Sequence, residues 1–161
     1  MKKGISGALA AALVTGLAAF FQPVLAEQDE KVYLVARFDL DGTTYNQVVF
    51  FQDDVITDLK SCKREMMYGR NGNWQVYSHI TNAVRGFTYS LSYTCALGRQ
   101  DFSGWDKSGQ INPIHTYEVV IRDQSLQVIP RNSYSACLKK VRSAGGETAK
   151  RYCARSTQTI Q

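Results

Sequence analysis

Apolar and small polar residues alternate along FTYSLSYTCAL, residues 87–97. A period of two is typical of a β-strand with one apolar and one polar face. The apolar positions of this stretch are Phe87, Tyr89, Leu91, Tyr93, Cys95 and Leu97. We therefore expect a half-buried strand here, with Cys95 turned toward the core.

A helical period precedes this strand in DDVITDLKSCKREMMYG, residues 53–69. Its apolar stripe consists of Val55, Leu59, Cys62 and Met66. Aspartates crowd the start of the segment and basic residues follow, which is the order that the helix dipole favours. Gly69 is a typical residue to end a helix. The pattern predicts an amphipathic helix that turns Cys62 toward the core.

The same order of elements is predicted twice. KVYLVARF and YNQVVFF, joined by a DLDGTT turn, form the first hairpin, before the Cys62 helix and the Cys95 strand. HTYEVVIR and SLQVIP, joined by DQ, form the second, before a helix with Cys137 and a weaker strand with Cys153. We expect two ββαβ pseudo-repeats, about 31–98 and 114–158, joined by a loop over 98–114. Chance convergence of the element order is the alternative.

Each predicted helix must bury its apolar stripe against its own sheet. The expected fold is therefore α+β: an antiparallel sheet with two helices packed on one face. Two helices on one face would also align their basic residues into a positive strip, although a solvated helix face is the simpler interpretation. The residues of this strip would be Lys60, Lys63, Arg64, Lys139, Lys140 and Arg142.

Four cysteines, an even number, predict two disulfides in an exported chain. Three connectivities are possible. The predicted helix and strand both turn their cysteines inward, which favours a bond between Cys62 and Cys95. Cys137 and Cys153 then pair by default. A metal site built from four thiolates and a free catalytic cysteine are weaker alternatives, because no two of these cysteines are close in the sequence.

The first 26 residues have the pattern of a secretory signal peptide: two lysines, a long apolar run and a VLA end. An uncleaved membrane anchor is the alternative, but Gln22 and Pro23 interrupt the apolar run. Cleavage would leave one domain, residues 27–161, with 17 basic and 14 acidic residues and thus a net charge of +3. We expect a periplasmic or secreted protein of bacterial type, with no later membrane span. This small charge argues against a nucleic-acid partner.

The loop 98–114 joins the two predicted repeats and is long for a compact domain. Long loops often carry binding residues, and an exposed tryptophan flanked by charges is a normal binding anchor. The predicted binding residues are Arg99, Asp101, Trp105, Asp106 and Lys107. The alternative is that Trp105 folds back and plugs the edge of the sheet.

Sequence motifs for catalysis are weak. His79 and His115 stand outside any recognised motif, and Glu118 alternates to the outer face of its strand with no carboxylate partner. We predict no cofactor, no metal and no catalytic residue. The first hypothesis is an exported, non-catalytic binding module for a protein or an anionic envelope polymer. The alternatives are a small envelope hydrolase that uses His115 with Asp101 or Asp106, and a structural or inhibitor subunit of an exported assembly.

Overall fold

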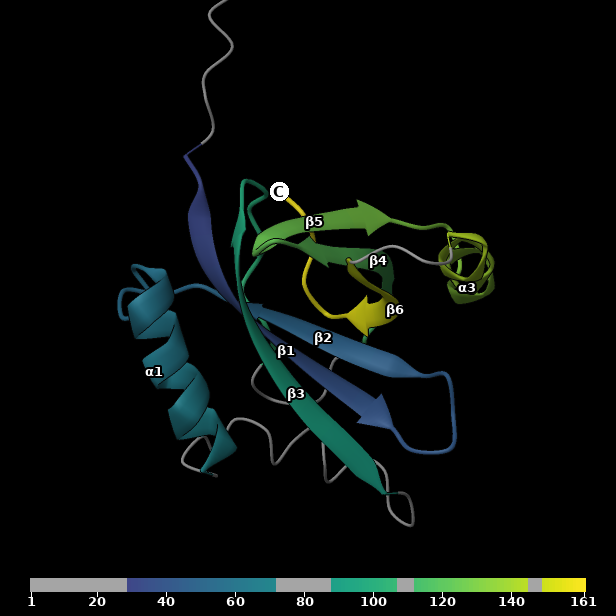
Figure 1. Cartoon of the computed structure of the whole chain (residues 1–161). Helices are drawn as coiled ribbons and strands as arrows, with labels where there is room; N and C mark the ends of the chain where they lie inside the picture. The colour runs from purple at the N-terminus through teal and green to yellow at the C-terminus, as the bar shows by residue number, and fades with distance from the viewer. Residues whose placement is uncertain (1–28, 72–87, 107–111, 145–148) are drawn as a thin grey trace, which may run out of the picture.

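The structure, a computed structural model, describes residues 29–71, 88–106, 112–144 and 149–161 (Figure 1). The described elements are β1 (Lys31–Leu40), β2 (Asn46–Phe51), α1 (Leu59–Arg70), β3 (Tyr89–Gly98), β4 (His115–Arg122), β5 (Ser125–Pro130), α3 (Tyr134–Ser143) and β6 (Lys150–Ser156). The strands close into a barrel in the order β1-β2-β6-β4-β5-β3. The predicted signal peptide and His79 fall outside the described residues.

The barrel consists of two three-stranded halves. In the N-terminal half, β1 pairs antiparallel with both β2 and β3. In the C-terminal half, β4 pairs antiparallel with both β5 and β6. The halves meet at two parallel seams, one between β2 and β6 and one between β3 and β5. Each half has the element order ββαβ, while its origin by duplication stays a prediction.

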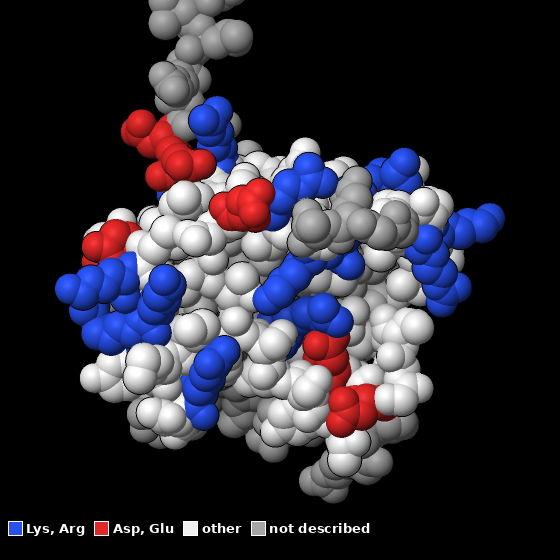
Figure 2. Space-filling model, in the orientation of Figure 1, with Lys and Arg blue, Asp and Glu red and all other residues white. Residues whose placement is uncertain are grey.

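The predicted antiparallel sheet with both helices on one face is wrong, because the two seams close the sheet into a mixed barrel. Helix α1 packs on β1 and β3, and α3 packs on β4 and β6. Each helix thus covers the outer face of its own half, and closure puts these two faces on different sides of the molecule (Figure 1). The basic residues of the helices accordingly lie in two separate groups rather than one strip (Figure 2).

Closure also buries both faces of the central strands. Tyr33 and Val35 of β1 point into the barrel interior, whereas Leu34 of the same strand packs beneath α1. In β3, Ala96 lies inside the barrel and Cys95 lies under α1. The face of β3 with the small side chains, which the alternation suggested was exposed, is therefore turned into the barrel at Ala96. Small side chains fit there because the interior of the barrel is narrow.

Two disulfides tie each helix to its own half. Cys62 of α1 is bonded to Cys95 of β3, with 6.0 Å between their Cα atoms. Cys137 of α3 is bonded to Cys153 of β6, with 5.9 Å between their Cα atoms. These are the two pairs that the sequence predicted. All four cysteines are buried, so each bond is part of the packing between a helix and the barrel.

Helix α1 begins later than its apolar stripe predicted. Asp58 caps it, accepting a hydrogen bond from the backbone N–H of Ser61, while the Ser61 hydroxyl accepts the N–H of Asp58. Val55 therefore precedes the helix and is 51% exposed. Gly69 does not end the helix, which continues to Arg70. Because of the capping box, the chain turns at Asp58 although the helical pattern starts earlier.

Glutamine side chains extend both seams beyond the strands. At the β2–β6 seam, Gln158 accepts the N–H of Phe50 at 2.7 Å and donates to the Phe50 carbonyl at 3.0 Å. At the β3–β5 seam, Gln100 accepts the N–H of Val128 at 2.8 Å and donates to its carbonyl at 2.7 Å. Each amide thus pairs with a strand backbone as another strand would.

Replacing the buried Gln158 should weaken the first seam. Gln158→Ala leaves the N–H and C=O of Phe50 without these partners, so we expect a loss of about 2–4 kcal/mol in the free energy of unfolding. Denaturant titration measures this loss. Gln127→Ala on the exposed face of β5 is the matched control and should change stability by less than about 0.5 kcal/mol. Equal stability of the two variants would contradict the assigned role.

Removing each disulfide in turn should cost stability, and the loss should be larger for the disulfide that closes the longer loop. Cys137→Ala with Cys153→Ala opens a separation of 16 residues and should cost about 3 kcal/mol of stability. Cys62→Ala with Cys95→Ala opens a separation of 33, so chain entropy predicts a cost about 0.6 kcal/mol larger. Guanidinium titrations of both variants test this order. The reverse order would show that packing around the bonds outweighs chain entropy.

Candidate functional site

One end of the barrel is covered by two short segments that follow β3 and β6. Phe102 and Ile160 form an isolated antiparallel bridge. The Phe102 ring stacks on Phe50 at 4.2 Å between ring centroids and meets the edge of Tyr33 at 5.3 Å. Both bridge residues pack against the interior core. We call the segments 101–103 and 159–161 the end cap.

A cleft of about 510 Å³ opens beside this end cap. We call it the first cleft, and its walls include Lys31, Phe51, Asp53, Asp101, Phe102 and Trp105. The half-buried Trp105 meets Phe51 edge to face, with 5.3 Å between ring centroids and 78° between planes. The end of β2, the start of β1 and the segment after β3 thus bring aromatic and charged side chains to one concave surface.

Charges in the first cleft are arranged around Asp101. Its carboxylate forms an ion pair with Lys31 from the start of β1. Burial, and next the nearby Asp101 charge, raise the pKa of Tyr33 to about 12. The Tyr33 hydroxyl donates to the Gln100 carbonyl at 2.7 Å. The phenol therefore stays protonated at neutral pH, and Asp101 is held by contacts within the protein.

The structure brings together only part of the predicted binding set. Asp101 and Trp105 line the first cleft. Arg99 is exposed outside its walls, and Asp106 places its backbone N–H 3.5 Å from the Thr157 hydroxyl. Lys107 lies outside the described residues. Lys31, Phe51 and Asp53 were not predicted, because they come from strand ends far away in the sequence.

A second cleft of about 360 Å³ also borders the end cap. Its wall includes Ile160, whereas the wall of the first cleft includes Phe102. It is lined by His115, Tyr117 and Arg131, among others. No carboxylate belongs to the described lining of this cleft, and Asp101 lines the first cleft instead. The hydrolase alternative paired His115 with Asp101 or Asp106. The structure does not bring His115 and Asp101 into one cleft, and Asp106 lies outside the described lining of both clefts.

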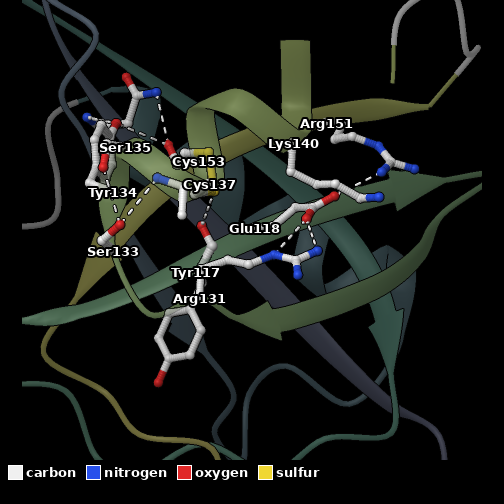
Figure 3. Close-up of a disulfide and its surroundings, with 12 residues drawn as sticks. Tyr117, Glu118, Arg131, Ser133, Tyr134, Ser135, Cys137, Lys140, Arg151 and Cys153 are labelled. Carbon is white, nitrogen blue, oxygen red and sulfur yellow. Dashed lines mark hydrogen bonds and ion pairs between the residues drawn. A yellow bond between two sulfur atoms is a disulfide. The ribbon is translucent and has the colours of Figure 1, made fainter. Parts of the chain in front are cut away.

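Sequence analysis missed the environment of Glu118. This side chain is fully buried and accepts hydrogen bonds from Arg131 Nε at 2.9 Å and from Arg151 Nη1 at 2.8 Å (Figure 3). It lies on the outer face of β4, beside the Cys137–Cys153 disulfide (Figure 3). Alternation placed Glu118 on the face of its strand opposite the apolar side chains, but α3 covers this face and two arginines bind the carboxylate. A carboxylate in an otherwise apolar strand was the available signal.

Comparisons with known proteins add no relative: no family model, no curated protein and no solved structure matches the chain. Within the described residues, no group of three or more His, Cys, Asp or Glu side chains is placed to hold a metal ion. In the same part of the chain, no helix is long and apolar enough to cross a membrane. The site is therefore interpreted from its own geometry.

Neutralising Asp101 should lower the pKa of Tyr33. Asp101→Asn removes the carboxylate charge, while burial, the larger cause, remains. We expect a pKa below the value of about 12 in the unmodified protein and still above the ordinary value of 10.0. Ultraviolet titration, with Tyr33→Phe to identify the transition, measures it. Asp53→Asn changes another carboxylate of the cleft and should leave the transition in place. An unchanged pKa in Asp101→Asn would contradict the coupling.

Proposed function

We propose that the protein is an exported, disulfide-bonded, non-catalytic binding module that holds its ligand in the first cleft. The main observation behind this proposal is that aromatic side chains and an ion pair line the same half-open first cleft. Phe51, Phe102 and Trp105 offer apolar surface, while Asp101 and Lys31 offer directional polar groups. Placed polar groups fix the orientation of a ligand in a binding site, and polar atoms form the larger share of this cleft's exposed lining.

The size and position of the cleft support a ligand that is part of a larger molecule. Its volume of about 510 Å³ falls within the range of ligand sites, roughly 300–1,000 Å³. The cleft is about half open to solvent, which suits one segment of a longer chain. A segment of a protein or of an anionic envelope polymer fits these features, with an apolar face on Trp105 and a charged group at the Lys31–Asp101 pair.

Export is supported by the covalent chemistry of the chain. Two disulfides favour an oxidising compartment, because thiols stay reduced in the cytosol. The predicted signal peptide at residues 1–26 also favours export. A periplasmic or secreted location follows as part of the proposal. A nucleic-acid partner is not proposed, because a net charge of +3 on the predicted mature chain is too small to favour one.

Capture of the ligand should depend on Trp105. The mature protein is immobilised and exposed to envelope extract at low and at high salt, and bound material is quantified. Trp105→Ala should reduce capture at least tenfold at both salt concentrations, because tryptophan is a frequent energetic centre of interfaces. Tyr68→Ala, which removes an exposed aromatic ring from α1, is the matched control and should capture normally. Equal capture by the two variants would contradict the proposed site.

A further inference from the structure

A second surface, whose residues line neither cleft, centres on Arg155 of β6. The Arg155 guanidinium lies over the rings of Tyr45 and Tyr134, with its Cζ atom 5.8 Å and 5.7 Å from their centroids. All three side chains are half-buried. They come from the β1–β2 turn, the start of α3 and the last strand. We call them the tyrosine–arginine cluster.

Arg155 has no acidic partner among the described residues, in contrast to three other arginines. Arg37 is paired with Asp39, and Arg131 and Arg151 are both paired with Glu118. Within the described residues, no carboxylate lies in bridging distance of Arg155, and its buried Nε atom has no hydrogen-bond partner. A guanidinium without an acidic partner can bind a planar anion such as a carboxylate through its terminal N–H groups, while the buried Nε stays out of reach.

The two tyrosines of the cluster are fixed before any partner binds. The Tyr134 hydroxyl accepts the N–H of Asn46 at 3.0 Å and donates to the Thr44 carbonyl. The Tyr45 hydroxyl accepts a hydrogen bond from the Gln47 amide at 3.1 Å. Docking on fixed rings costs little side-chain entropy. Tyrosine and arginine are also enriched among the residues that dominate binding energy.

The α3 side of the cluster is basic, whereas the Arg37–Asp39 ion pair lies near Tyr134 on the other side. Helix α3, which begins at Tyr134, carries Lys139, Lys140 and Arg142 and no acidic residue. Lys and Arg side chains lie over the α3 side of the molecule (Figure 2). Such a surface attracts negative charge over a distance of about 10 Å at moderate salt. Its complement is an acidic chain.

We propose that the tyrosine–arginine cluster is a docking site for an acidic segment of a partner protein. One carboxylate of that segment accepts hydrogen bonds from Arg155 beside the packed rings of Tyr45 and Tyr134. Further carboxylates meet the basic residues of α3. This site is independent of the first cleft, so each proposal can fail without the other.

The test uses a fluorescent hexaglutamate peptide and the full mature protein at low salt. Anisotropy should show saturable binding that weakens as salt is added. Arg155→Gln should weaken binding at least tenfold, whereas Lys63→Gln on α1 removes the same charge elsewhere and should change it less than twofold. Arg155→Lys, which keeps the charge and loses the planar fork, should fall between them. Trp105→Ala should bind hexaglutamate normally.

Three results would overturn the proposal. The first is the absence of saturable binding to the unmodified protein. The second is equal weakening by Arg155→Gln and Lys63→Gln, which would show attraction to net charge alone. The third is stronger binding to anionic phospholipid vesicles that does not depend on Arg155. A thermal unfolding scan of each variant shows whether it is folded, and Arg155→Lys carries the test if Arg155→Gln is not.

Discussion

The two parallel seams are the constraint on which the rest of the structure depends. Each half is a well-paired antiparallel sheet, but β2–β6 and β3–β5 are joined over short stretches. Gln158 and Gln100 lengthen these seams by pairing their amides with the strand backbones. Without the seams, each half would expose two sheet edges with unpaired N–H and C=O groups. Closure satisfies these groups and encloses the interior core.

Closure also decides where function can lie. The segments that supply the seam glutamines continue directly into the end cap, so the walls of both clefts are positioned by the same residues that join the halves. The outer faces of the barrel are covered by helices held in place by disulfides. Concave surface therefore remains at the end of the barrel, and a fixed aromatic and basic surface remains beside α3.

The two halves use the same architecture with different chemistry. Leu34 of β1 pairs with Cys95 beneath α1, while Glu118 of β4 pairs with Cys153 beneath α3. A buried leucine in one half thus corresponds to a buried carboxylate held by two arginines in the other. Such an ion cluster contributes little net stability compared with apolar packing, but removal of one partner is costly. The C-terminal half is consequently the more polar, and it carries Arg155.

The sequence alone predicted the strands, the two helices, the ββαβ order and the two disulfide pairs, because periods of two and about 3.6 residues can be recognised from neighbouring positions. It also predicted Asp101 and Trp105, which line the first cleft, as binding residues. Only the tertiary structure decided that the sheet closes, that Lys31 and Phe51 join the cleft, and that Glu118 is buried. These features depend on contacts such as Gln158 with Phe50, 108 residues apart, which no local pattern encodes.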